Sequence, residues 1–167
     1  VTWEVRSTPG YFTPPNWDDF TFGTWIPWWY MWREPIRGQE QVLTYKGYTD
    51  AAGAHYLRLD FEAVDPPQPM NVNAQGTVMD VNRQAWTASA NMLVHPASLY
   101  VGLRTERYFV RMGDPLKVEA IVVDLDGVPI SGRTIALRAA RLEWKYVNGS
   151  WQEVEANAQD CAAQSAE

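Results

Sequence analysis

The sequence has no apolar run of about eighteen residues, the length that a membrane-crossing helix needs, so no transmembrane helix is predicted. Cysteine and histidine are scarce, with one cysteine and two histidines in 167 residues. Cys161 therefore has no partner for a disulfide within the chain. The ligand spacings of zinc sites and the glycine-rich loop of nucleotide sites are also missing. No metal or other cofactor is expected.

Positive charge is scarce too. The formal net charge is −6 and the isoelectric point is near 4.9, a balance that repels a phosphate backbone. No basic stripe interrupts this balance, so nucleic acid is excluded as an expected partner. Helical periodicity is almost absent as well, which disfavours helical and α/β folds.

Residues for catalysis do not assemble into a known motif. His55 and His95 lie outside any serine or cysteine nucleophile motif, which favours structural or surface roles. Cys161 has no basic cluster beside it to activate a thiolate. We expect it to be an exposed thiol in a loose end over residues 157–167, and the alternative is a partner cysteine beyond Glu167. No catalytic residue is predicted, and the chain is not expected to be an enzyme.

Apolar and polar residues alternate with the period of a β-strand. "HYLRLDFEA" (55–63) and "WTASANMLV" (86–94) each place apolar side chains on one face, which predicts strands with one buried side. "VTWEV" alternates from the first residue, so the chain is expected to begin inside a domain. Such alternating segments recur along the chain and are separated by the turn-forming residues Gly, Pro, Asn and Asp, which is typical of β-sandwiches.

Three turn or register features are predicted in the second half of the chain. "DLDG" is followed by Pro129 and Gly132, which predicts a hairpin between residues 116–124 and 134–138. The apolar phase then slips, which predicts a β-bulge at residues 139–141. The Asn-Gly pair in "VNGSW" predicts a second hairpin turn.

A tryptophan-rich stretch interrupts this regular pattern. Four of the nine tryptophans lie in "GTWIPWWYMWREP", namely Trp25, Trp28, Trp29 and Trp32. The interpretations left open are a lid over the end of a sandwich, a platform for sugar rings, and a protein-docking surface. Direct membrane insertion is disfavoured, because Pro27, Pro35 and nearby charges break the amphipathic pattern. We predict these four tryptophans as contact residues for a neighbouring domain or a ligand.

Two longer segments resemble a known family. "YFVRMGDPLKVEAIVVDLDGVPISGRTIAL" (108–137) resembles a macroglobulin-type module of alpha-2-macroglobulin, and residues 78–103 are similar to the junction between two such modules in bacterial members. "VTWEV" resembles the second half of the same hairpin, whose first half would lie upstream. No Cys-x-Glu-Gln or Cys-Gly-Glu-Gln occurs, so the family's thioester chemistry transfers to no residue here.

The resemblance and the strand pattern together predict an all-β chain of two tandem antiparallel β-sandwich domains of macroglobulin or immunoglobulin-like type. Residues 1–96 are expected to form the first, carrying the tryptophan-rich insertion, and residues 97–167 the second, which is C-terminally incomplete. Both domains are expected to be truncated.

The function implied is that of non-catalytic structural domains in a bacterial alpha-2-macroglobulin-like, protease-trapping inhibitor of the cell envelope. Its location would be the periplasm or the bacterial cell surface. Its partners would be neighbouring domains of the same full-length protein and, through that protein, target proteases. The alternative is a carbohydrate- or protein-binding module of a surface protein that uses the tryptophan-rich loop.

Overall fold

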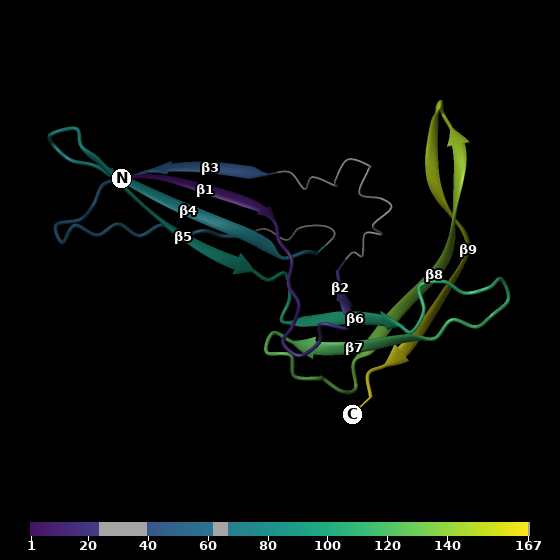
Figure 1. Ribbon diagram of the computed structural model, residues 1–167. Helices are drawn as coiled ribbons and strands as arrows, with labels where there is room; N and C mark the ends of the chain where they lie inside the picture. Colours follow the sequence, from purple (N-terminus) through teal and green to yellow (C-terminus); the bar gives the residue numbers. More distant parts are fainter. Residues whose placement is uncertain (24–39, 62–66, 167) are drawn as a thin grey trace. The chain divides into compact units, whose positions relative to one another are not determined.

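The computed structural model describes residues 1–23, 40–61 and 67–166 (Figure 1). Within these ranges the regular structure consists of nine β-strands, and the ladders between them are antiparallel. The described part contains no helix long and apolar enough to cross a membrane. The prediction of an all-β chain built from antiparallel sheets is confirmed.

The chain forms two compact units. The first combines Val1–Thr13 with Thr21–Ser98, and the second combines Pro14–Phe20 with Leu99–Glu167. The predicted sandwich domains 1–96 and 97–167 stay a prediction, and that scheme did not anticipate that Pro14–Phe20 belongs to the second unit. The short strand β2 (Thr21–Phe22) follows this segment directly.

The first unit contains a four-stranded antiparallel sheet in the order β3-β1-β4-β5 (Figure 1). Its strands are β1 (Thr2–Pro9), β3 (Gln41–Lys46), β4 (Met70–Met79) and β5 (Ala85–Val94). The strands predicted for the start of the chain and for residues 86–94 are therefore present. β1 has a ladder on both edges, to β3 and to β4. The expectation that a hairpin half lies upstream of Val1 stays a prediction.

One face of this sheet carries the core of the first unit. Val5, Val72 and Ala74 are buried there, and Leu57 and Leu59 pack against them. The predicted alternation over 55–61 is correct, but the prediction of a strand is wrong, because these residues lie outside every strand. The segment covers the sheet with its side chains, and its backbone lies in no ladder.

The opposite face of the sheet is polar. The Asn73 side-chain amide donates to the Asn91 side-chain oxygen over 2.6 Å, and the Thr77 and Thr87 hydroxyls lie 2.9 Å apart. These cross-strand pairs follow from the register of β4 and β5. The sheet therefore has one apolar face and one polar face, as the alternation predicts.

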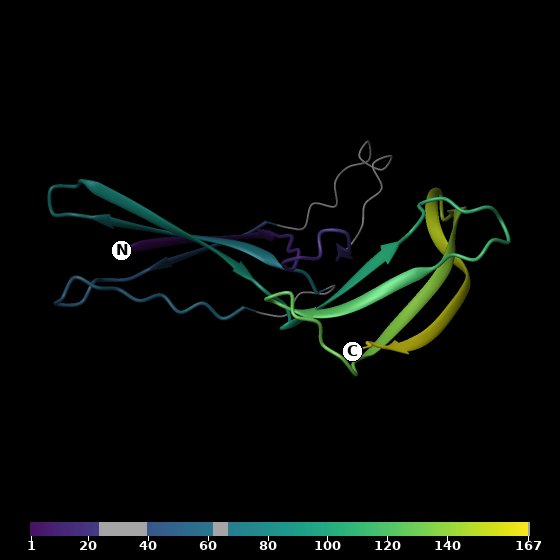
Figure 2. The same cartoon turned by 60° about the horizontal axis from the view of Figure 1, so that its bottom comes forward.

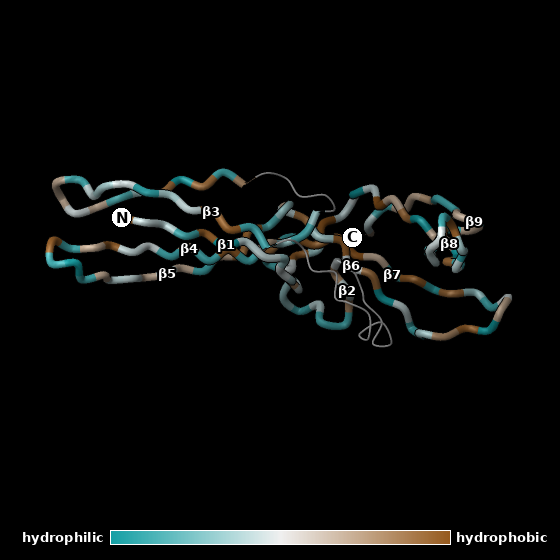
Figure 3. The backbone as a smooth tube through the Cα atoms, turned by 90° about the horizontal axis from the view of Figure 1, so that it is seen from above, coloured by the Kyte–Doolittle hydropathy of each residue, from teal (hydrophilic) through white to brown (hydrophobic). Residues whose placement is uncertain are grey.

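The second unit contains two further antiparallel ladders. β6 (Leu99–Thr105) pairs with β7 (Val118–Asp124), and the long β8 (Thr134–Val147) pairs with β9 (Ser150–Gln164) (Figure 2). The residues of β7 are mostly hydrophobic, as the colour of the backbone tube shows (Figure 3), and Val122 and Val123 are buried.

Three predictions concern the β8–β9 ribbon, namely a bulge, a hairpin turn and a loose C-terminal end. The register shifts between Ala139 and Arg141, which confirms the predicted bulge. Asn148 and Gly149 have φ of 49° and 86°, the left-handed pair that a two-residue hairpin turn requires, so this turn is confirmed too. The prediction of a loose end over 157–167 is wrong, because β9 continues to Gln164.

The hairpin predicted across "DLDG" is not formed as expected. A turn does form there, and the Ile130 amide donates to the Val122 carbonyl over 2.8 Å. The pairing there is one isolated bridge between Val123 and Pro129. The two strands otherwise pair with different partners, β7 with β6 and β8 with β9. The backbone bonds on both sides of Pro129 are formed, from the Asp124 amide to the Val128 carbonyl at 3.0 Å and from the Ile130 amide to the Val122 carbonyl, so the pairing ends beyond Ile130.

Pro14–Phe20 packs onto this turn. The Trp17 indole N–H donates to the Gly127 carbonyl over 2.8 Å, and the Trp17 ring meets the Phe20 ring edge-on at 5.5 Å between centroids. Pro14 and Phe20 are buried. This short segment therefore supplies a substantial part of the apolar packing of the second unit.

Three turns share one hydrogen-bond pattern. In each, an aspartate side-chain oxygen accepts the backbone N–H groups two and four residues further on, at 2.8–3.0 Å. The aspartates are Asp50, Asp80 and Asp124. The fourth residue of each turn is left-handed, and it is Gly53 (φ 79°), Arg83 (φ 63°) or Gly127 (φ 80°). Arg83 is the one position of the three where a side chain opposes that conformation.

Replacing Arg83 with glycine is therefore expected to stabilise the first unit by about 0.5–1 kcal/mol, because glycine adopts positive φ without a Cβ penalty. Urea unfolding of the chain measures the change. Arg83→Ala is the control, since it removes the same side chain but keeps the Cβ atom. Equal stability of the glycine and alanine variants would contradict the prediction.

Candidate functional site

The predicted contact residues Trp25, Trp28, Trp29 and Trp32 lie outside the described residues. Their assignment to an interdomain or ligand contact therefore stays a prediction.

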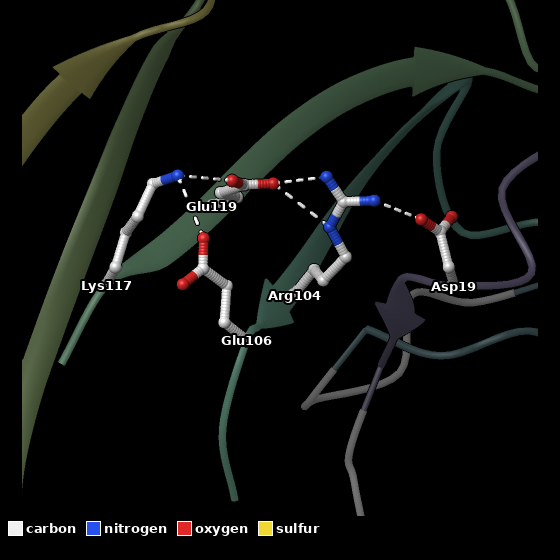
Figure 4. A network of polar contacts seen from close by, with 5 residues as sticks. All are labelled: Asp19, Arg104, Glu106, Lys117 and Glu119. Carbon is white, nitrogen blue, oxygen red and sulfur yellow. Dashed lines mark hydrogen bonds and ion pairs between the residues drawn. The ribbon is translucent and has the colours of Figure 1, made fainter. Parts of the chain in front are cut away.

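A network of charged side chains lies on the second unit (Figure 4). Arg104 of β6 stands opposite Glu119 of β7 in the ladder, and its guanidinium donates to the Glu119 carboxylate and to Asp19. Lys117 pairs with Glu119 at 2.9 Å and with Glu106 at 3.3 Å. Five side chains thus form a continuous chain of opposite charges, which we call the charged network.

The charged network attaches Pro14–Phe20 to the β6–β7 ladder. The Arg104 guanidinium contacts Asp19 and also lies over the Phe20 ring, 4.5 Å from its centroid. Arg104 thereby joins the ion pairs to the apolar packing around Trp17. Through contacts with two carboxylates and one aromatic ring, this one arginine attaches the Pro14–Phe20 segment to the rest of the second unit.

The charged network keeps Glu119 ionised. Hydrogen bonds from Lys117 and Arg104 lower the pKa of Glu119 from its usual 4.5 to about 2. The same contacts raise the pKa of Lys117 and of Arg104. A carboxyl group with so low a pKa is a poor proton donor or acceptor near neutral pH, where general acid–base catalysis needs a pKa close to the ambient pH. The geometry favours a structural role.

This pKa shift predicts a stability loss in acid. Because the pKa of Glu119 is lower in the folded chain than in the unfolded chain, the unfolded chain binds the proton first as pH falls from 4.5 to about 2. Stability linked to Glu119 is therefore present above pH 4.5 and lost over that interval. We expect Glu119→Gln to reduce the fall in melting temperature of the second unit between pH 5 and 2.

Glu106→Gln is the matched control, because Glu106 contacts Lys117 but not Arg104 in the charged network. Thermal melts at stepped pH, followed by hydrogen exchange of β6 and β7, measure the effect in this unit. Identical pH profiles for wild type and Glu119→Gln would show that the network does not set the acid response.

A hollow of about 590 Å³ lies on the apolar face of the first unit. Its lining combines apolar residues of the sheet, such as Leu43 and Met70, with polar residues that include Ser7, Asp60 and His95. The His95 ring meets the Phe12 ring edge-on at 4.6 Å between centroids. This hollow was not predicted, because residues from five separate segments form it.

The two histidines take part in packing contacts. The Trp3 indole N–H donates to His55 Nδ1 over 3.1 Å, and His95 packs on Phe12. Among the described residues no group of three or more His, Cys, Asp or Glu side chains could hold a metal ion. Cys161 is exposed, as expected, but it lies in β9 opposite Leu137. A pairing of Cys161 beyond the chain stays a prediction.

A second aromatic cluster lies near the tip of the β8–β9 ribbon. Leu142, Trp144, Tyr146 and Trp151 are 43–65% exposed, and the ladder register places them on one face. We call these four residues the aromatic tip. Tyr146 and Trp151 meet at an interplanar angle of 64°, so these two rings do not form a flat platform. The alternation of even-numbered residues in the sequence was the signal for this shared face.

Comparison with known proteins gives two curated relatives and two solved structures, and no family model matches. Circularly permutated Ras protein 2 of Dictyostelium discoideum is 25% identical over 144 residues, which covers 77% of this chain and 4% of that protein. An Alpha-2-macroglobulin homolog of Nostoc sp. is 24% identical over 136 residues, which covers 81% of this chain and 7% of that protein. The chain thus spans under a tenth of the length of either relative.

The two solved structures are of Escherichia coli alpha-2-macroglobulin. Its native conformation aligns with a TM-score of 0.49 at 16% identity, covering 99% of this chain and 12% of that one. Its elastase-activated form aligns with a TM-score of 0.39 at 16% identity, covering 97% and 14%. The resemblance to alpha-2-macroglobulin-like proteins that the motifs carry is confirmed by the Nostoc relative.

Proposed function

We propose that this chain supplies non-catalytic structural domains to a larger alpha-2-macroglobulin-like, protease-trapping protein of the bacterial cell envelope. The observation that carries the proposal is the match to the Alpha-2-macroglobulin homolog, which covers 81% of this chain but 7% of that protein. Such a piece is expected to contact neighbouring domains of the same polypeptide. It would meet target proteases through the full-length protein.

Exposed apolar side chains on strand faces support a packing role. On the core face of the first sheet Val78 is 44% exposed and Trp86 opposite it is 82% exposed. The aromatic tip adds a similar surface on the second unit. Clustered apolar exposure of this kind is typical of surfaces that pack against other protein. Burial of these side chains by neighbouring domains would stabilise the full-length arrangement.

The test uses the full-length gene product incubated with an endopeptidase. We expect capture of the protease by the full-length protein, and neither capture nor peptide turnover by this chain alone. Trp86→Ser in the full-length protein is expected to weaken capture by loosening the packing of this unit. Tyr48→Ser is the control, because Tyr48 is 94% exposed and lies outside the strands. Peptide turnover by the isolated chain would overturn the non-catalytic assignment.

Location and the alternative function have their own measurements. Cell fractionation with an antibody against this chain should place the protein in the periplasm or at the cell surface, and a cytoplasmic signal would contradict the proposed location. Glycan-array binding by this chain that is lost on Trp28→Ala or Trp29→Ala would favour the carbohydrate-binding module instead.

A further inference from the structure

We propose that Asn148, in the turn of the β8–β9 ribbon, is a deamidation site. Asn148 is the one asparagine in the sequence that a glycine follows. Asn148 and Gly149 form the two-residue turn between β8 and β9, and both are exposed. The product is a turn that carries aspartate or isoaspartate in place of asparagine. The proposal goes beyond the proposed function and does not depend on it, because it concerns the chemistry of this turn alone.

The reaction uses the Asn148 side-chain amide, the next backbone nitrogen and water. The Gly149 nitrogen loses its proton and attacks Cγ of Asn148. A bond forms between this nitrogen and Cγ, the bond from Cγ to Nδ2 breaks, and ammonia leaves with a proton. Water then opens the five-membered ring. Attack of water at Cγ gives aspartate, whereas attack at the backbone carbonyl carbon gives isoaspartate, in which the chain runs through Cβ and Cγ.

Both reacting groups are accessible. Nothing lies within 4 Å of the Cβ position of Gly149. Among the residues that the structure describes, neither the Asn148 side-chain amide nor the Gly149 N–H has a hydrogen-bond partner. The Gly149 nitrogen therefore gives up no hydrogen bond when the peptide plane rotates to bring it to Cγ. Glycine permits this rotation because it has no Cβ atom, and a turn at the end of a ribbon opens at low cost.

The Asp126-Gly127 pair shows what a protected turn looks like. An aspartate followed by glycine can close the same ring, with loss of water in place of ammonia. Here, however, the Gly127 N–H donates to the Asp124 carbonyl over 3.2 Å, and the Gly127 carbonyl accepts the Trp17 indole N–H over 2.8 Å. Rotation of this peptide plane would break the bond to Asp124. The structure thus favours reaction at Asn148 over reaction at Asp126.

Asn157 is the matched comparison within the same ribbon. It is exposed, and its φ of 53° is close to the 49° of Asn148. The residue that follows it is Ala158, whose Cβ atom crowds the attacking nitrogen. Asn157 therefore resembles Asn148 in exposure and in backbone conformation, and it differs in the residue that must attack. A difference in rate between the two isolates the contribution of Gly149.

Isoaspartate would alter the turn itself. Its extra backbone methylene lengthens a two-residue turn, and the length of a turn sets the register of the two strands that it joins. The Tyr146 and Trp151 rings, one pair away from the turn residues' own neighbours, meet at 5.5 Å between centroids. We expect isoaspartate to loosen this contact of the aromatic tip. Aspartate adds a negative charge but leaves the backbone length unchanged.

The experiment is incubation of the intact purified chain at neutral and at mildly alkaline pH, followed by peptide mapping with fragmentation that distinguishes isoaspartate from aspartate. Asn148 is expected to react at least about tenfold faster than Asn157, because the alanine Cβ atom hinders the attack there. The rate at Asn148 should rise with pH, since the Gly149 nitrogen must lose its proton. Equal rates at Asn148 and Asn157, or faster conversion at Asp126 than at Asn148, would overturn the proposal.

Variants separate the chemistry from its consequence. Gly149→Ala should slow the reaction at least about tenfold. Because alanine opposes the φ of 86° at this position, Asn148→Gln is the second variant, and it should remove the reaction since its longer side chain must close a six-membered ring. Freshly purified Asn148→Asp carries the charge without the methylene, so its hydrogen exchange over residues 144–153 should match wild type. Aged chain rich in isoaspartate should exchange faster there, and exchange equal to that of fresh chain would refute the loosened contact.

Discussion

Replacing Gly127 with alanine is expected to destabilise the second unit by about 2–4 kcal/mol, from the left-handed backbone and from overpacking together. Gly127 has φ of 80°, and a Cβ atom there would lie 2.3 Å from the Pro15 carbonyl oxygen. That oxygen belongs to the backbone of the packed Pro14–Phe20 segment. The same substitution therefore displaces the acceptor of the Trp17 indole bond.

Two glycines serve as controls for this prediction. Gly53 occupies the equivalent position in the Asp50 turn with φ of 79°, and Gly132 lies in the same unit with φ of 69°. Neither has an atom within 4 Å of its Cβ position, so alanine there should cost only about 1–2 kcal/mol, the backbone part of the penalty. Urea unfolding with hydrogen exchange resolved by unit measures all three. Equal losses at Gly127 and Gly132 would show that the contact with Pro15 is unimportant.

Local features, including the pairing of β8 with β9 across the Asn-Gly turn, could be predicted from the sequence, whereas strand partners distant in the chain could not. The Asn148-Gly149 turn and the bulge near Ala139 depend on neighbours in the chain, and both are confirmed. The prediction of a hairpin across Asp124–Gly127 was wrong because its second strand, β8, pairs with β9 instead. The attachment of Trp17 to Gly127 joins residues 110 apart in sequence, and no local pattern marks it.

The candidate surfaces show the same division. The high density of tryptophan in one stretch identified four candidate contact residues, Trp25, Trp28, Trp29 and Trp32. They lie outside the described residues, so their role stays a prediction. The alternation at Leu142, Trp144 and Tyr146 was visible in the sequence, but their exposure depends on what packs over the β8–β9 ribbon. Exposure is a tertiary property, so periodicity alone separates the two faces without showing which one is covered.

Replacing Val72 with alanine is expected to destabilise the first unit by about 2–3 kcal/mol, because the burial of two methyl groups is lost and a cavity remains. Val72 is 1% exposed, and it belongs to the cluster that Leu57 and Leu59 cover. The prediction therefore tests whether the segment over 55–61 acts as the second layer of this unit.

Val78 is the matched control, because it lies on the same strand and the same face but is 44% exposed. Val78→Ala should lower the free energy of unfolding by under about 1 kcal/mol, since the methyl groups of Val78 bury less apolar area than those of Val72. The two substitutions remove the same atoms, so their difference isolates the covering layer. Urea unfolding followed by hydrogen exchange of β4 measures both. If the two variants lose equal stability, residues 55–61 do not cover the sheet in solution, and the packing of the first unit must come from elsewhere.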